Sequence, residues 1–180
     1  MKKLFIIVVL IGFLSSCSND SETETKEIVP GEVAVGIKSG TDINDLFRFI
    51  NQFDLVVDNV NSLTFTSDLP PDKLQFILAN LNEKNYTNDG VNWFVTGYLS
   101  PQTNRIHIFP RLFDMNNIDY QRDWVSAMAE LELHDKHNFG LNSGIIQFRV
   151  PEGQESRWKN QFENYDIVDW AELNYTVDLN

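Results

Sequence analysis

Apolar and polar residues alternate along several short stretches of the chain, and between these stretches apolar residues recur at helical spacing. The stretch Glu32–Ile37 alternates in this way, which is typical of a half-buried strand. Apolar residues at helical spacing run from Ile43 to Phe53 and from Leu74 to Leu81, and each run predicts a helix with one buried face. Further predicted strands cover 55–60, 63–65 and 91–99. The order through residue 100 is therefore strand-helix-strand-strand-helix-strand, the ferredoxin-like arrangement.

The same order recurs in the second half of the chain. Strand alternation around Ile108 and Phe148 and helical stripes around Trp124 and Trp158 precede a last predicted strand over Val168–Val177. We expect an α+β fold of two ferredoxin-like βαββαβ halves with antiparallel sheets, over residues 30–100 and 101–180. A Trp and a Tyr that lie five residues apart in the closing strand of each half support this repeat. The alternative is one such unit that is interrupted by a long insertion over 69–143.

The first residues resemble a bacterial lipoprotein signal. Two lysines precede the apolar run Leu4–Leu14, which is too short for a permanent membrane helix of about 20 residues. The segment from Leu14 to Cys17 resembles a lipobox. This resemblance implies a signal peptide over 1–16, cleavage before Cys17 and lipid attachment to that cysteine. The alternative is an ordinary cleaved signal in which the cysteine has no role.

Residues 17–29 form a predicted acidic and flexible tether. The part from Ser18 to Glu27 contains four acidic residues and no apolar residue, so it cannot fold alone. Ser18, directly after the cysteine, resembles lipoproteins that are sent to the outer membrane, and the acidic residues resemble signals for export to the cell surface. We therefore expect an outer membrane lipoprotein, attached to the membrane through Cys17, that faces the periplasm or the exterior.

The charge of the chain excludes one class of partner. Of 180 residues, 26 are acidic and 14 are basic, which gives a net charge of −12. Because nucleic acid binding needs clustered Lys and Arg, we expect no nucleic acid partner. The hydrophobic fraction of 42% is sufficient for a folded core, and the single cysteine excludes an internal disulfide framework.

The sequence contains no arrangement of side chains that predicts catalysis. His134 and His137 have a spacing that can place two imidazoles on one helical face, but the further ligands of a zinc site are not close in sequence. Asp42 and Asp45 resemble part of a calcium loop that lacks its glycine and its distant glutamate, and a helix start is the simpler explanation. We therefore expect a protein that is not an enzyme and that uses no metal or cofactor.

The aromatic residues suggest a binding surface. The chain has 13 Phe, 5 Tyr and 4 Trp, and most of them fall on predicted buried stripes. In the predicted strand over 91–99, Phe94 and Tyr98 share the face opposite Val91 and Val95. A sheet with helices on one side leaves such a face free, either to bind a partner or to pack against the other half of the chain.

Two stretches resemble the propeptides of subtilases. Pro30–Lys38, with the sequence PGEVAVGIK, resembles the opening strand of these propeptides. Val168–Tyr175, with the sequence VDWAELNY, resembles their closing strand, especially in the fervidolysin-like group, with Leu173 in place of the usual proline. The resemblance implies a ferredoxin-like fold.

Subtilase propeptides act as folding templates and as inhibitors of their protease. In that family the outer face of the sheet covers two helices of the enzyme, and the C-terminal tail lies in the substrate cleft as an added strand. The resemblance implies that this chain binds a subtilisin-like serine protease, as a separate protein, and inhibits or chaperones it. The expected contacts are Phe94, Tyr98, Glu172, Tyr175, Val177, Leu179 and Asn180. The alternative is a noncatalytic surface lipoprotein that binds a glycan or a partner protein through an aromatic and acidic surface.

Overall fold

The computed structural model describes residues 27–88, 91–137 and 143–176. These residues form two antiparallel sheets with helices packed against them, which confirms the α+β class. The predicted signal peptide, Cys17 and most of the tether lie outside the described residues.

The first sheet is built from both ends of the described chain, and with its helices we call it the outer half. Its elements are β1 (Glu27–Ile37), α1 (Ile43–Ile50), β2 (Val56–Asn61), β8 (Ile145–Arg149), α4 (Glu155–Phe162) and β9 (Val168–Thr176). The spatial order is β6-β2-β8-β1-β9, in which β6 (Leu112–Phe113) is a short edge strand from the middle of the chain. If the other four strands are numbered along the chain, their spatial order is 4-1-3-2, which is ferredoxin-like.

The second sheet is built from one continuous segment, and with its helices we call it the inner half. Its elements are β3 (Phe65–Ser67), α2 (Leu74–Asn82), β4 (Val95–Leu99), β5 (Ile106–Pro110), α3 (Ile118–Glu130) and β7 (Leu133–Asp135). A single 3₁₀ turn at Pro71–Lys73 leads into α2. The strand order β4-β5-β3-β7 is again 4-1-3-2 when it is read from β7.

The two ferredoxin-like halves are nested, and not consecutive as the predicted division between residues 100 and 101 implies. Strands β2 and β8 are neighbours in the outer sheet, although the whole inner half lies between them along the chain. The arrangement follows the alternative of one unit with a long insertion, and the insertion is itself a second unit. Asn61 and Ile145 are direct partners across β2 and β8, so the inserted segment leaves and re-enters the sheet at one point.

The Trp and Tyr spacing that suggested a repeat does not mark equivalent strands. Tyr98 lies in β4, the second strand of the inner half, whereas Tyr175 lies in β9, the last strand of the outer half. Trp93 precedes β4 and forms an isolated bridge with Asn88. The predicted strands over 55–60 and 63–65 also belong to different sheets and do not form a hairpin.

Helix α1 shows how the sequence specifies these elements. The Asp42 carboxylate caps the helix by accepting a hydrogen bond of 2.9 Å from the Asp45 amide, and these two acids therefore start a helix. The apolar residues on the inward face are buried against the outer sheet; they are Ile43, Leu46, Phe47, Phe49 and Ile50. Their helical spacing is the pattern from which the helix was predicted.

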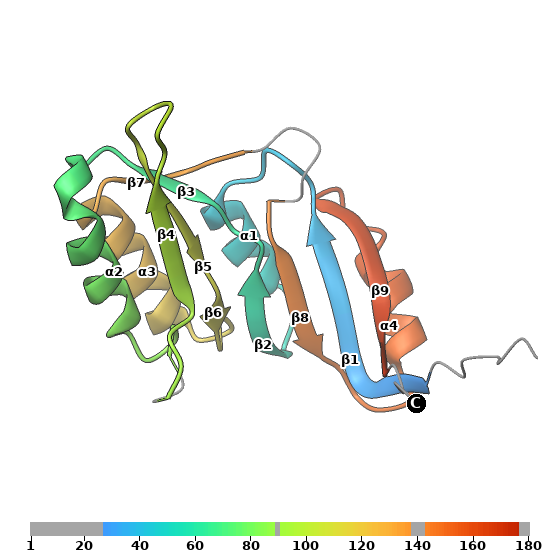
Figure 1. Cartoon of the computed structure of the whole chain (residues 1–180). Helices are drawn as coiled ribbons and strands as arrows, with labels where there is room; N and C mark the ends of the chain where they lie inside the picture. Colours follow the sequence, from blue (N-terminus) through green and yellow to red (C-terminus); the bar gives the residue numbers. More distant parts are fainter. Residues whose placement is uncertain (1–26, 89–90, 138–142, 177–180) are drawn as a thin grey trace, which may run out of the picture.

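Each half carries its helices on one face of its sheet. Figure 1 shows α1 and α4 against the outer sheet and α2 and α3 against the inner sheet. The sheets meet where β5 continues into β6, because β6 pairs with β2. No described helix covers the opposite face of either sheet, and we call these two faces the helix-free faces.

Candidate functional site

The helix-free face of the outer sheet carries one aromatic ring at close range to the backbone. Gly36 in β1 is the direct partner of Trp170 in β9. A Cβ atom at Gly36 would lie 2.2 Å from the indole Cε2 of Trp170, so the ring lies directly over the glycine. Because Gly36 has no side chain, the indole ring of Trp170 can occupy the space above it; we call this space the seat of Trp170.

A polar hollow of about 530 Å³ lies on the same face, beside β6. Its lining includes Glu32, Asp58, Asn59, Gln147, Arg149 and Asn174. The Arg149 guanidinium lies 2.8 Å from the Glu32 carboxylate and 2.5 Å from that of Asp58. The Asn174 amide donates to Glu32 over 2.8 Å and to Gln147 over 3.0 Å. The hollow thus holds planar polar groups in fixed orientations, an arrangement that suits a ligand rich in hydroxyl groups.

Phe94 directly precedes β4 of the inner sheet, and its side chain contacts β6 of the outer sheet. Its ring meets that of Phe113 in β6 edge to face, with centroids 4.7 Å apart. The Arg111 guanidinium lies over both rings, 5.9 Å from the centroid of Phe94 and 5.3 Å from that of Phe113. Phe94 is half-buried and therefore packs between the halves, one of the two roles that its position allowed.

Tyr98 lies on the helix-free face of the inner sheet, where 49% of its surface is exposed. Its ring stacks on His107, with centroids 5.0 Å apart, and on Phe109 at 5.7 Å. Burial lowers the pKa of His107, and the nearby cations Lys136 and Arg105 lower it further. An uncharged imidazole is a favourable stacking partner for the phenol ring, so Tyr98 is held in place while its outer side stays open.

The structure brings together only some of the predicted contact residues. Glu172 is exposed in β9 and is the partner of Ala34, which places it on the helix-free face of the outer sheet. Tyr175 is also exposed but, three residues further along the strand, it points to the opposite face. Tyr98 belongs to β4 of the inner sheet, and Phe94 directly precedes that strand. Val177, Leu179 and Asn180 lie outside the described residues.

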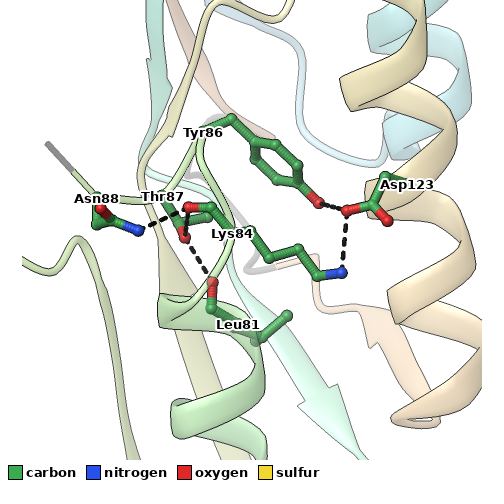
Figure 2. A network of polar contacts seen from close by, with 6 residues as sticks. All are labelled: Leu81, Lys84, Tyr86, Thr87, Asn88 and Asp123. Carbon is green, nitrogen blue, oxygen red and sulfur yellow. Dashed lines mark hydrogen bonds and ion pairs between the residues drawn. The ribbon is translucent and has the colours of Figure 1, made fainter. Parts of the chain in front are cut away.

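A cluster of polar contacts joins the loop after α2 to helix α3 (Figure 2). The Tyr86 hydroxyl donates to the Asp123 carboxylate over 2.7 Å, and the Lys84 ammonium lies 2.9 Å from the same oxygen. Burial raises the pKa of Tyr86, and the neighbouring Asp123 raises it further. The hydrogen bond from Tyr86 lowers the pKa of Asp123, as does Lys84. Both shifts keep the phenol protonated and the carboxylate charged. The cluster therefore connects the loop after α2 to α3 through hydrogen bonds and does not act as an acid–base pair; we call it the Tyr86–Asp123 tie.

The same cluster closes the C-terminal end of α2. Figure 2 shows the side chains of Thr87 and Asn88 turned back toward the last helical turn. The Thr87 hydroxyl donates to the Leu81 carbonyl over 2.5 Å, and the Asn88 amide donates to the carbonyls of Asn82 and Lys84 over 2.9 and 2.8 Å. Side chains therefore add hydrogen bonds to the carbonyls at this helix end.

The histidine spacing that resembled a metal site has a different structural context. His134 lies in β7, and its imidazole is 3.2 Å from the Asp68 carboxylate. The ring of His137 lies 3.3 Å from the Ser143 hydroxyl. Across residues 27–88, 91–137 and 143–176, no group of three or more His, Cys, Asp or Glu side chains could hold a metal ion. In the same part of the chain, no helix is long and apolar enough to cross a membrane.

Sequence reasoning missed the polar hollow and the seat of Trp170. Most residues of the hollow come from β1, β2, β8 and β9, and they look like ordinary polar residues of their own strands. Arg111 and Phe113 join them from the segment at β6. A glycine within the alternating stretch of β1 was the one available signal for Trp170, because glycine in a strand often marks a close approach.

Comparison with known proteins adds no identification to this geometry. No protein-family model matches the chain, and no curated protein or solved structure is significantly similar to it.

Proposed function

We propose that the outer half binds a subtilisin-like serine protease and inhibits or chaperones it. In this proposal the helix-free face of the outer sheet packs on the surface of the protease. Residues 177–180, which follow β9, enter the substrate cleft as an added strand.

The observation that carries this proposal is the position of β1 and β9. The two stretches that resemble subtilase propeptides lie at opposite ends of the described chain and are neighbours in the sheet, with Val35 opposite Ala171. Strand β9 is an edge strand, and its sheet has one uncovered face. A contact through an added strand and an open face requires this combination.

The polarity of the face indicates the kind of surface that it fits. Arg149 is the one cation paired with both Glu32 and Asp58, so these three side chains keep a net negative charge. Glu172 is exposed with no cation within ion-pair distance among the described residues. The chain as a whole carries a charge of −12. A basic protease surface is therefore the complementary partner, and electrostatic steering should accelerate association at low salt.

Inhibition assays test the proposal. Residues 27–180 and a version that ends at Tyr175 are compared against a panel of subtilisin-like proteases. We expect inhibition by the longer chain, and a loss of potency of at least about tenfold on truncation, because the cleft contact is removed. Inhibition that survives the truncation unchanged removes residues 177–180 from the mechanism, and absence of inhibition across the panel contradicts the proposal.

A pair of charge reversals tests the face itself. Glu172→Lys places a cation on the helix-free face of the outer sheet, whereas Glu130→Lys makes the same change of charge on the exposed surface of α3. Only Glu172→Lys should slow association with the protease. Equal effects of the two variants would show that net charge matters and the proposed face does not.

The polar hollow favours a second candidate, a noncatalytic protein that binds a glycan. Amide, carboxylate and guanidinium groups converge there, and groups of this kind can donate to and accept from sugar hydroxyls. A glycan array and the variants Gln147→Ala and Asn174→Ala test this candidate. Glycan binding that both variants abolish, in a protein that inhibits no protease, would favour this candidate over the first proposal. If no glycan on the array binds the protein, this candidate is wrong.

We also propose that the chain is an outer membrane lipoprotein that is attached through Cys17. The support is the resemblance of residues 14–17 to a lipobox. Cys17→Ala should release the protein from the membrane fraction, with Ser18→Ala as a control that stays attached. Unchanged fractionation of Cys17→Ala contradicts the lipid anchor.

A further inference from the structure

Strand β4 presents an open backbone edge on the inner half, far along the chain from the proposed protease contact. It is the outermost strand of its sheet and has β5 as its one neighbour. In the pairing with β5, alternate residues turn their backbone groups outward, and these are Val95, Gly97 and Leu99. Such an edge is a template for another strand.

The side chain of Asn82 already occupies one end of this edge. Its amide donates to the Val95 carbonyl over 2.9 Å, and its carbonyl accepts from the Val95 amide over 3.0 Å. Asn82 thus makes the two hydrogen bonds that a neighbouring strand would make. Asn82 is held at the end of α2, where the Asn88 side-chain amide donates to the main-chain carbonyl of Asn82. Figure 2 shows this helix end. The edge beyond it, at Gly97 and Leu99, has no such cover among the described residues.

A groove of about 700 Å³ runs between α2 and this edge. Leu78 and Ala79 line it on the helix, and Trp93 and Gly97 line it on the strand side. Trp93 is 76% exposed. An exposed indole and apolar side chains of α2 therefore lie next to unpaired backbone groups. Extended peptides are bound in this way: the backbone pairs with the edge and alternate side chains enter the groove.

The charge around the groove selects the peptide. Glu83 is exposed where the groove ends and also lines a second hollow, which contains Asp119 and Asp123. The neighbouring Lys84 is engaged by Asp123, so it does not neutralise Glu83. A cationic residue at one end of the peptide is thus complementary to this end of the groove.

We propose that the β4 edge and the adjoining groove bind an extended peptide segment with apolar residues at alternate positions and a basic end. A second copy of the chain is the less suitable occupant, because each copy carries a charge of −12 and the same acidic groove end. The proposal is independent of the protease contact, which uses the other sheet.

Fluorescence anisotropy with a synthetic peptide tests this site on the full-length protein. The probe is a labelled nonapeptide in which valine and threonine alternate and two lysines end the chain. We expect saturable binding that Trp93→Ala weakens by at least about tenfold, because a central aromatic anchor is lost. Trp93 is mostly exposed, so the variant should fold normally. Tyr175→Ala, an exposed aromatic residue in β9, is the matched control and should bind like the unaltered protein.

Two further comparisons separate strand addition from nonspecific adhesion. Glu83→Lys should weaken binding by up to about fivefold, whereas the control Glu130→Lys should not. Methylation of the peptide amides on one edge should abolish binding, and methylation on the other edge should preserve it, because only one edge pairs with β4. Equal tolerance of both methylated peptides, equal effects of the matched variants, or no saturable binding below about 1 mM overturns the proposal. A dimer that Trp93→Ala dissociates would assign the edge to a second copy and would overturn it as well.

Discussion

The outer and inner halves have the same strand order, yet different interactions hold them together. The outer core is a cluster of edge-to-face and stacked rings; its members are Phe49, Phe53, Phe148, Trp158, Phe162 and Tyr165. The inner half has a smaller aromatic group, in which the buried ring of Trp124 contacts the buried rings of Phe65 and Tyr86. Aliphatic side chains fill the rest of the inner core, and specific polar ties close its helix ends.

This difference corresponds to how each half is closed along the chain. The inner half is continuous, so all its connections lie within one segment of the chain, and polar contacts between neighbouring elements close its helix ends. The outer half must bring β8, α4 and β9 back to β1 and β2 across the whole insertion. A large aromatic core offers the nonlocal contact energy that this closure requires.

Excision of the inner half is the most severe test of the comparison. Asn61 and Ile145 are partners across β2 and β8, so a two-residue Asn-Gly turn can replace residues 62–144. We expect a folded outer half that is about 3–6 kcal/mol less stable, because the buried side chains of Leu63 and Leu112 are lost. Urea denaturation and an amide NMR spectrum measure this, and an unfolded product would show that the outer half depends on the inner one.

Loss of one ring should affect the two halves unequally. Phe162→Ala removes a fully buried ring from the outer cluster and should cost about 3–5 kcal/mol. Hydrogen exchange should accelerate in β1, β8 and β9, whereas the continuous inner half should keep its protection. Trp124→Ala is the counterpart and should accelerate exchange in the inner half. A uniform acceleration after either change would indicate one cooperative unit and not two.

The elements of both halves follow from local pattern, whereas their nesting does not. The stripe from Ile43 to Ile50 predicts α1 because helical periodicity needs only neighbouring residues. The pairing of Asn61 with Ile145 depends on contacts between distant strands, and no local pattern distinguishes it from a consecutive repeat. Two similar βαββαβ series therefore fit the sequence in either arrangement.

The candidate surfaces divide in the same way. Alternation within one strand predicts which face of β4 carries Tyr98, whereas its exposure is known only from the structure. The polar hollow needs the five strands of the outer sheet in the correct order, and the groove beside β4 needs the relative position of Asn82 and Val95. Both depend on tertiary contacts, so sequence periodicity could not locate either of them.

The contact between Gly36 and the Trp170 indole provides the next test of the outer half. Gly36→Ala puts a methyl group into the space of the indole and should cost about 1–3 kcal/mol, because the ring must leave its position. In the double variant with Trp170→Ala the clash is absent, and the added cost of Gly36→Ala should nearly vanish. Thermal denaturation of the four proteins gives the coupling, and an additive result would contradict the stated contact.

The Tyr86–Asp123 tie is the matching test in the inner half. Tyr86→Phe removes the donor to a charged carboxylate and should cost about 1–2 kcal/mol, at the lower end of the range for charged partners because Asp123 is half exposed. Tyr120→Phe, which changes a neighbouring ring on α3, is the control and should cost less. Equal losses of stability in the two variants would show that the tie contributes nothing specific.

The smallest expected effect concerns the hydrogen bonds of Glu155 in the outer half. It is measured as a difference in stability between a Glu155 variant and the unaltered protein, at neutral and at acidic pH. The Glu155 carboxylate at the start of α4 accepts hydrogen bonds from the amides of Gly31 over 2.7 Å and Gly153 over 2.9 Å. These bonds, with that to Gly31 the strongest, lower the pKa of Glu155 below its usual value. Its charged form is therefore favoured by folding, and it stabilises the protein above the ordinary carboxyl pKa of about 4.3.

This contribution disappears as the pH falls through the lowered pKa of the folded state. Glu155→Gln keeps an acceptor but removes the charge, so it should be less stable than the unaltered protein at neutral pH. The gap should narrow in acid, because the unaltered carboxylate then becomes protonated as well. Urea denaturation at the two pH values measures the gap, with the exposed Glu152→Gln as a control that should show none. A gap of equal size in both conditions would mean that the geometry of the acceptor, and not its charge, holds α4 to β1 at Gly31.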